Sequence, residues 1–86
     1  MEKKVNILNS LGFEVNGIQE NRVFGTAVVE ASRQTVRGTL EVIWGDNGTA
    51  RVVKPNGTIK WLYDKSDAQI RRALVQTIEA NTCGGR

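Results

Sequence analysis

Two glycine-containing turn sequences constrain the fold of this chain more than any other feature. The loop 45–48 (Gly-Asp-Asn-Gly) separates the segments 35–44 and 49–54, and both segments are rich in β-branched or aromatic residues. The loop 55–57 (Pro-Asn-Gly) then separates 49–54 from a third such segment, 58–63. Asn-Gly accepts the left-handed backbone conformation of tight hairpins, and proline presets one turn position. The three segments are therefore predicted to form an antiparallel meander.

Alternation of side chains along these segments predicts the two faces of the sheet. One face should pack against helices and carries the apolar residues Val36, Leu40, Val42, Trp44, Val52, Ile59 and Trp61. The other face should point outward, with Arg37, Thr39, Glu41 and Ile43 from the first segment, Thr49, Arg51 and Val53 from the second, and Thr58, Lys60 and Leu62 from the third. Both tryptophans are thus expected in the core.

Upstream of the meander, turn residues divide the chain into further strands. A short strand is predicted to start at Phe13 and a longer one to cover 23–31. Turn candidates lie at 16–17 and 20–21, and 32–34 (Ser-Arg-Gln) is the predicted turn into the meander. Together with the meander, these strands give an antiparallel sheet of four to five strands.

A short helix is predicted at the N-terminus, over residues 2–11. Apolar residues recur at helical spacing up to Gly12, which can take the positive φ of a C-terminal helix cap. Phe13 then stands where such a cap places an apolar contact back to Leu8. The competing interpretation of the same residues is a strand over 3–8.

A second helix is predicted to begin at Ser66. Ser66 and Gln69 have the S-x-x-Q spacing of a capping box, and Asp67 places a negative charge in the first turn. A stripe at helical spacing, which should pack on the sheet, is formed by Ile70, Ala73, Leu74, Thr77 and Ile78. The helix should end near 80–81, leaving 82–86 as a flexible tail.

The predicted fold class is α+β: an antiparallel sheet of four to five strands, with a short N-terminal helix and a C-terminal helix packed on one face. A chain of 86 residues has room for one domain, which we place at 1–81. Because so small a core gives modest stability, a homodimer is an alternative to the monomer.

The chain lacks most of the side chains on which enzymes rely. It has no histidine, and its one cysteine, Cys83, can build neither a disulfide framework nor a structural zinc site. No P-loop or Rossmann glycine pattern is present. No cofactor, metal site or catalytic residue is therefore expected. The lone cysteine, the charged N-terminus and the lack of a long apolar run predict a cytoplasmic protein without membrane attachment.

The excess of basic residues indicates an anionic partner. The formal net charge is +3, and Arg37, Arg51 and Lys60 are predicted on one outward face, where they would neutralise phosphates. Arg71 and Arg72 add a second basic element on the C-terminal helix. The preferred function is therefore non-enzymatic nucleic-acid binding through these five residues. A glutamate on the same face argues against it, and an ordinary solvated sheet face also accounts for the arginines.

A protein partner is the alternative function. Ile43, Val53 and Leu62 would be apolar residues on the arginine-bearing face, and they or the edge strands would form the interface. A phage-type inhibitor or an adaptor of a larger host protein has this size and composition.

The predicted element order resembles that of known nucleic-acid-binding modules. Three strands and a helix, from Val36 to Asn81, resemble the DNA-binding modules of the integrase-arm and AP2 type. With the N-terminal helix added, the outline is similar to a double-stranded-RNA-binding domain. The resemblance is one of topology and carries no residue roles, because 66–69 (Ser-Asp-Ala-Gln) stands where the RNA-binding family has a lysine-rich helix entry.

Overall fold

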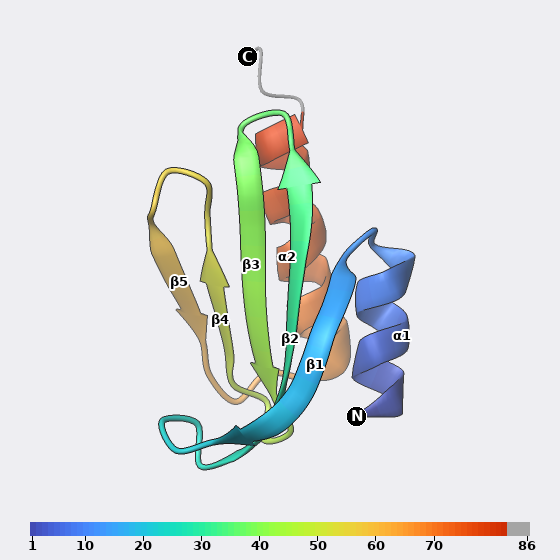
Figure 1. The fold of residues 1–86 in the computed structure, drawn as a ribbon, viewed down its shortest axis with the longest axis vertical. Helices are drawn as coiled ribbons and strands as arrows, with labels where there is room; N and C mark the ends of the chain where they lie inside the picture. Colours follow the sequence, from blue (N-terminus) through green and yellow to red (C-terminus); the bar gives the residue numbers. More distant parts are fainter. Residues whose placement is uncertain (83–86) are drawn as a thin grey trace.

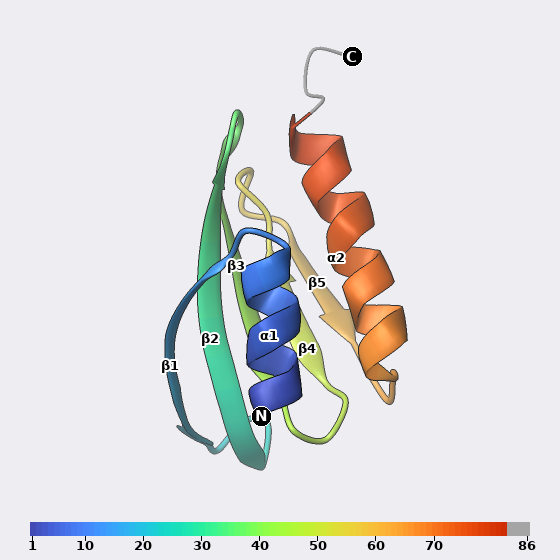
Figure 2. The same cartoon turned by 90° about the vertical axis from the view of Figure 1, so that its right-hand side faces the viewer.

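The computed structural model describes residues 1–82 and has an α+β fold (Figure 1). Its elements, in chain order, are α1 (Glu2–Ser10), β1 (Glu14–Asn21), β2 (Thr26–Thr35), β3 (Gly38–Gly45), β4 (Ala50–Val53), β5 (Ile59–Leu62) and α2 (Asp67–Thr82). The strands form one antiparallel sheet in the order β1-β2-β3-β4-β5. Figure 2 shows both helices on the same side of the sheet, so the other face is open. The predicted fold class is confirmed.

The N-terminal helix ends in the way the sequence indicates. Gly12 adopts a φ of 84°, and its N–H donates to the Asn9 carbonyl at 3.0 Å. The Phe13 N–H donates to the Leu8 carbonyl at 2.9 Å, which completes a Schellman motif. The interpretation of 3–8 as a strand is therefore wrong. The cap also brings Phe13 into the same core cluster as Leu8.

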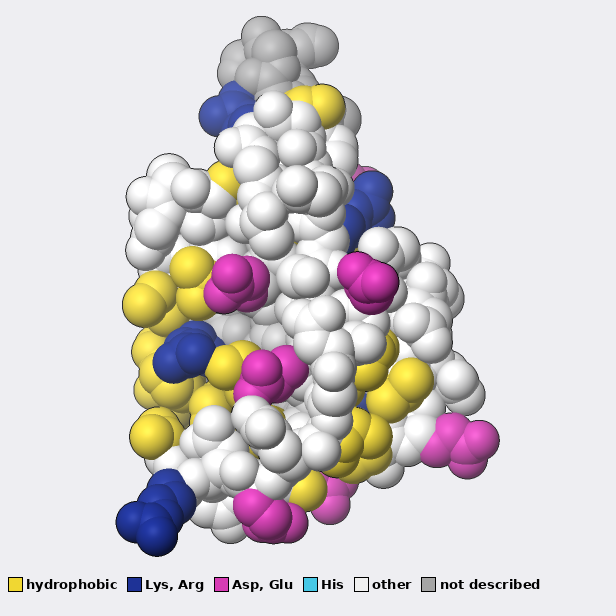
Figure 3. All heavy atoms as spheres, viewed as in Figure 1, with side chains coloured by type: hydrophobic (Ala, Val, Ile, Leu, Met, Phe, Trp, Pro, Cys, Tyr) yellow, Lys and Arg dark blue, Asp and Glu magenta, His cyan; other side chains and the backbone are white. Residues whose placement is uncertain are grey.

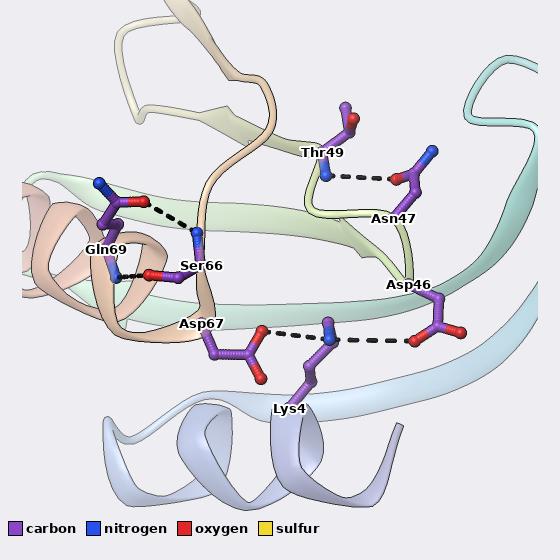
Figure 4. Close-up of polar contacts among 7 residues, drawn as sticks. All are labelled: Lys4, Asp46, Asn47, Thr49, Ser66, Asp67 and Gln69. Atoms are coloured by element: carbon purple, nitrogen blue, oxygen red, sulfur yellow. Dashed lines mark hydrogen bonds and ion pairs between the residues drawn. The ribbon is translucent and has the colours of Figure 1, made fainter.

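The capping box predicted for the second helix is confirmed (Figure 4). The Gln69 N–H donates to the Ser66 hydroxyl at 3.2 Å, and the Ser66 N–H donates to the Gln69 side-chain oxygen at 2.9 Å. The helix continues to Thr82, slightly beyond its predicted end, and the rest of the predicted tail, 83–86, lies outside the described residues. Neither helix within residues 1–82 is long and apolar enough to cross a bilayer.

One lysine of α1 joins three parts of the fold (Figure 4). The Lys4 ammonium lies 3.1 Å from a carboxylate oxygen of Asp67, at the start of α2, and 3.9 Å from one of Asp46, in the β3–β4 loop. The same ammonium is 5.5 Å from the centroid of the Trp44 ring. Lys4 therefore holds α1 against α2 and the β3–β4 hairpin while its charge lies over a core tryptophan.

The core lies between the helices and the sheet. Its buried members are Leu8, Phe13, Val29, Ala31, Leu40, Val42, Trp44, Ala50, Val52, Ile70, Leu74 and Ile78. The predicted burial of Trp44 is confirmed. The prediction that Val36, Ile59 and Trp61 lie on the same face as Trp44 and pack against the helices is wrong, because all three side chains are exposed.

The turn between β2 and β3 falls at Val36 and Arg37, so the prediction of a turn at 32–34 is wrong. The Thr35 hydroxyl accepts a hydrogen bond from the Arg37 N–H at 3.1 Å and donates one to the Gly38 carbonyl at 2.7 Å. A threonine hydroxyl therefore closes a turn that contains neither proline nor asparagine. As a consequence, Val36 is 75% exposed at the turn.

β1 is one strand that runs through the first turn candidate predicted upstream and ends at the second. The register shifts between Val15 and Gly17, so the first candidate is a β-bulge. At the second, the Asn21 side-chain oxygen accepts hydrogen bonds from the N–H groups of Val23 at 2.9 Å and Phe24 at 3.1 Å. The strand predicted from Val23 therefore starts after this loop, with β2.

Candidate functional site

The β4–β5 hairpin decides which side chains of β5 face outward. Its register pairs Arg51 with Trp61 and Val52 with Lys60. Directly paired residues share a face of the sheet, and Val52 is buried beneath the helices. Trp61 and Ile59 therefore lie on the open face and Lys60 on the helix side, which is the reverse of the prediction.

The five residues predicted to bind nucleic acid do not form one surface. Arg37 lies in the β2–β3 turn, in a hollow that is also lined by residues of the β4–β5 loop and the end of α2. Arg51 is half-buried on the open face, and Lys60 is on the other side of the sheet. Arg71 and Arg72 are exposed on α2, which covers the face opposite to Arg51.

The middle of the open face is acidic. Glu41 is paired with Ser32, and Ser32 with Glu14, so two carboxylates lie across β1, β2 and β3. Glu30 lies on the same face, two residues before Ser32, and its carboxylate accepts a hydrogen bond from the Gln19 side chain. Figure 3, which views this face, shows the acidic side chains over the middle of the sheet. The open face therefore does not have the basic character expected from the sequence.

Exposed hydrophobic side chains gather at the β5 edge of this face. Ile59, Trp61 and Tyr63 alternate along β5 and the residue that follows it, and they are 51%, 36% and 60% exposed. Val53, half-buried, is paired with Ile59. These four residues are called the β5 patch below. Figure 3 shows hydrophobic side chains on the side of the open face where β4 and β5 lie.

Trp61 is held in place from three sides. Its ring lies 5.6 Å from that of Phe24 and stacks on that of Tyr63 at 5.9 Å, and the Arg51 guanidinium is 5.8 Å from its centroid. Gly45 leaves room for Phe24, because a Cβ atom at this position would lie 2.9 Å from a carbon of the phenylalanine ring. An aromatic side chain that is already fixed loses little rotamer entropy on binding, which suits an interface anchor.

Basic residues border the other side of β5. A groove between β5 and α2 is lined by Leu62, Lys65, Gln69, Arg72, Ala73 and Gln76. The register of β5 places Lys60 on the same side as Leu62. Within residues 1–82, Asp46 and Asp67 form ion pairs with Lys4. Lys60, Lys65 and Arg72 form no ion pair with a described carboxylate. The helix side of β5 therefore carries cations that no described carboxylate neutralises.

The apolar interface residues predicted from the sequence are divided between the two faces. Ile43 and Val53 are half-buried on the open face, whereas Leu62 packs against the core on the helix side. The β5 patch is not apparent from the sequence, because the alternation of hydrophobic residues in 58–63 predicts Ile59 and Trp61 in the core. The signal that identifies the patch is the length of the loop 55–57, which sets the pairing of β4 with β5.

Potential metal ligands do not cluster in groups of three or more within residues 1–82. No protein-family model matches the chain, and comparisons with curated proteins and with solved structures found no match. Function is therefore inferred from the β5 patch, the basic groove beside it and the acidic middle of the open face.

Proposed function

We propose that this chain is a non-enzymatic binding module that holds a protein partner on the β5 patch. The observation that carries the proposal is the set of three large exposed side chains, Ile59, Trp61 and Tyr63, along the edge strand β5 and the residue that follows it. Contiguous exposed apolar groups, and aromatic ones above all, are typical of protein interfaces. We place its action in the cytoplasm, because a lone cysteine offers no disulfide framework for a secreted domain.

A protein partner has more support than the nucleic acid preferred from the sequence. Phosphate binding depends on several cations along one path. Glu30 and Glu41 share the open face with Arg51, and a nearby carboxylate repels a phosphate. Nucleic-acid binding through the adjacent arginines of α2 stays a prediction.

The test is a pull-down from a lysate of the source cells, run with and without nuclease treatment. It compares the wild-type protein with an Ile59→Ser/Tyr63→Ser variant, which removes two exposed side chains of the β5 patch. The matched control is Ile18→Ser/Val36→Ser, whose side chains are 53% and 75% exposed and lie outside the patch. We expect one protein partner that the wild type and the control retain and the patch variant loses. Retention by all three proteins, or loss of every bound protein on nuclease treatment, contradicts the proposal.

A further inference from the structure

β5 is a free edge of the sheet. It is the last strand in the order, and in Figure 1 none of the helices and strands within residues 1–82 lies along its outer side. The hairpin is closed by the Lys54 N–H, which donates to the Thr58 carbonyl at 2.9 Å. Because hydrogen-bonded and non-hydrogen-bonded pairs alternate along antiparallel strands, the backbone groups of Lys60 point toward β4. The N–H and C=O groups of Ile59 and Trp61 therefore point outward and are available to another strand.

The two sides of this edge differ in their chemistry. The open side carries the β5 patch, whereas the helix side carries Lys60, Lys65 and Arg72 around the groove that Leu62 lines. Side chains of a strand point alternately to the two faces of its sheet. A strand added to β5 would therefore present every second side chain to the apolar patch and the others to the cations.

We propose that the partner contributes an extended acidic segment that adds to β5 as a sixth strand. This inference rests on the proposed function and specifies how the β5 patch is used. Apolar side chains at alternate positions of the segment contact the patch, and aspartates or glutamates between them face Lys60, Lys65 and Arg72. Main-chain hydrogen bonds to Ile59 and Trp61 supply affinity, and the alternating side chains supply specificity.

A second copy of the chain fits this edge less well. Lys60 lies within the short strand β5, and β5 contains no acidic residue. Two-fold pairing of β5 with its copy would bring two Lys60 side chains onto adjacent strands. Like charges on neighbouring strands are destabilising, and lysine on an edge strand is a common protection against such pairing.

The decisive experiment measures amide hydrogen exchange by NMR with and without a synthetic peptide. The probe is Ser-Glu-Val-Glu-Phe-Asp-Val-Glu-Ser with blocked termini, and its control has the same composition with the apolar residues placed together. At saturating probe we expect exchange at Ile59 and Trp61 to slow at least about tenfold, because these amides are unbonded in the free protein. Lys60 and Leu62, already bonded to β4, should change little. Failure of the probe to bind, or equal binding of the control peptide, overturns the inference.

A charge-reversal series tests the acidic character of the segment. The Lys60→Glu/Lys65→Glu/Arg72→Glu variant should bind the probe at least about tenfold more weakly than the wild type does. A peptide with lysine in place of each acidic residue should restore the affinity of this variant. All three residues are exposed, so the fold should persist. The control variant Lys3→Glu/Arg22→Glu/Arg71→Glu changes the net charge equally at other exposed positions. Equal weakening in both variants would mean that net charge alone attracts the peptide, and the placement proposed here would be wrong.

Failure of this inference can be distinguished from failure of the proposed function. If the patch variant loses its protein partner but Ile59 and Trp61 stay unprotected in the wild-type complex, the patch binds through side chains alone and strand addition is wrong. If the patch variant keeps the partner, the proposed function is wrong. Protection of these two amides that rises with protein concentration, without any peptide, identifies a second copy as the occupant and overturns the acidic segment.

Discussion

The two tryptophans lie on opposite faces of one sheet, and each has a cation over its ring. Trp44 is fully buried beneath the helices, with the Lys4 ammonium 5.5 Å from its centroid. Trp61 is 36% exposed on the open face, with the Arg51 guanidinium 5.8 Å away. A cation–tryptophan pair therefore lies at the core on one face and at an exposed aromatic side chain on the other.

Under the proposed function, this difference assigns stability to one face of the sheet and binding to the other. The helix side contains nearly all the buried apolar residues, so it should determine the free energy of unfolding. The open side leaves large apolar groups in water, which gives no stability and is usual where a partner covers them. Four experiments test this division, from the largest expected effect to the smallest.

Leu74→Ala should produce the largest loss of stability. The Leu74 side chain is 1% exposed at the centre of the helix-side core, and such truncations cost about 2–5 kcal/mol of unfolding free energy. Urea denaturation followed by circular dichroism measures the change. Ile59→Ala, at a side chain 51% exposed on the open face, should cost within about 0.5 kcal/mol. A similar loss in both variants would show that the open face also maintains the fold.

Gly57→Val should follow. Gly57 has a φ of 88° in the β4–β5 loop, and a β-branched residue in the left-handed region costs roughly 1–2 kcal/mol. Gly17→Val is the matched control, because Gly17 lies in β1 outside the left-handed region, and a Cβ atom added there would have no neighbour within 4 Å. If the two variants unfold at the same urea concentration, the loop does not depend on glycine and the orientation of Trp61 needs another explanation.

Lys4→Met tests the cation over the buried tryptophan. The substitution keeps the aliphatic part of the side chain but removes the ion pairs with Asp46 and Asp67 and the charge over Trp44. We expect a loss of about 1 kcal/mol from these partly buried contacts. Lys3→Met removes an exposed neighbour and should leave the urea midpoint unchanged. If Lys3→Met loses more unfolding free energy than Lys4→Met, the contacts of Lys4 do not stabilise the core.

The smallest effect is expected on nucleic-acid binding. We expect weak binding to mixed-sequence duplex DNA at low salt, with Arg51→Ala changing the affinity less than about twofold because acidic residues share its face. Fluorescence anisotropy across a salt series measures the affinity of the wild type and of Arg51→Ala for the DNA. If the log–log slope is instead about −3 to −5 and falls by about one in Arg51→Ala, the open face binds phosphates and the division proposed here is wrong.

The parts of the fold predicted from the sequence are those closed by short-range bonds. The capping box of Ser66 and Gln69, and the cap at Gly12, each join residues that are only a few positions apart. The Asn-Gly sequence of the β3–β4 loop likewise identifies its turn without reference to the rest of the chain. Such motifs determine their backbone conformation without long-range contacts, and they predict the meander and both helices.

The parts that were not predicted depend on register. A shift of the register by one residue moves every side chain of a strand to the other face of the sheet. The alternation of residue types along the strand is the same in either register, so it does not determine which face is buried. The hydrophobic character of Ile59 and Trp61 predicts them in the core, whereas the hairpin places them on the open face with Arg51. The same shift moves Lys60 to the helix side. The position of Glu14 beside Ser32 depends on the β1–β2 pairing and its bulge, for which the sequence has no clear signal.

The two edges of this sheet differ in their regularity. β1 is the edge opposite to β5, and the register shift between Val15 and Gly17 interrupts the regular ladder of N–H and C=O groups near the start of that strand. The pairing of β4 with β5 has no such shift. A strand that followed the whole of β1 would therefore have to cross the bulge, whereas one that followed β5 would meet an uninterrupted ladder. Two copies that met through β5 would leave their bulged β1 strands as the outer edges, which makes further growth of the sheet less favourable.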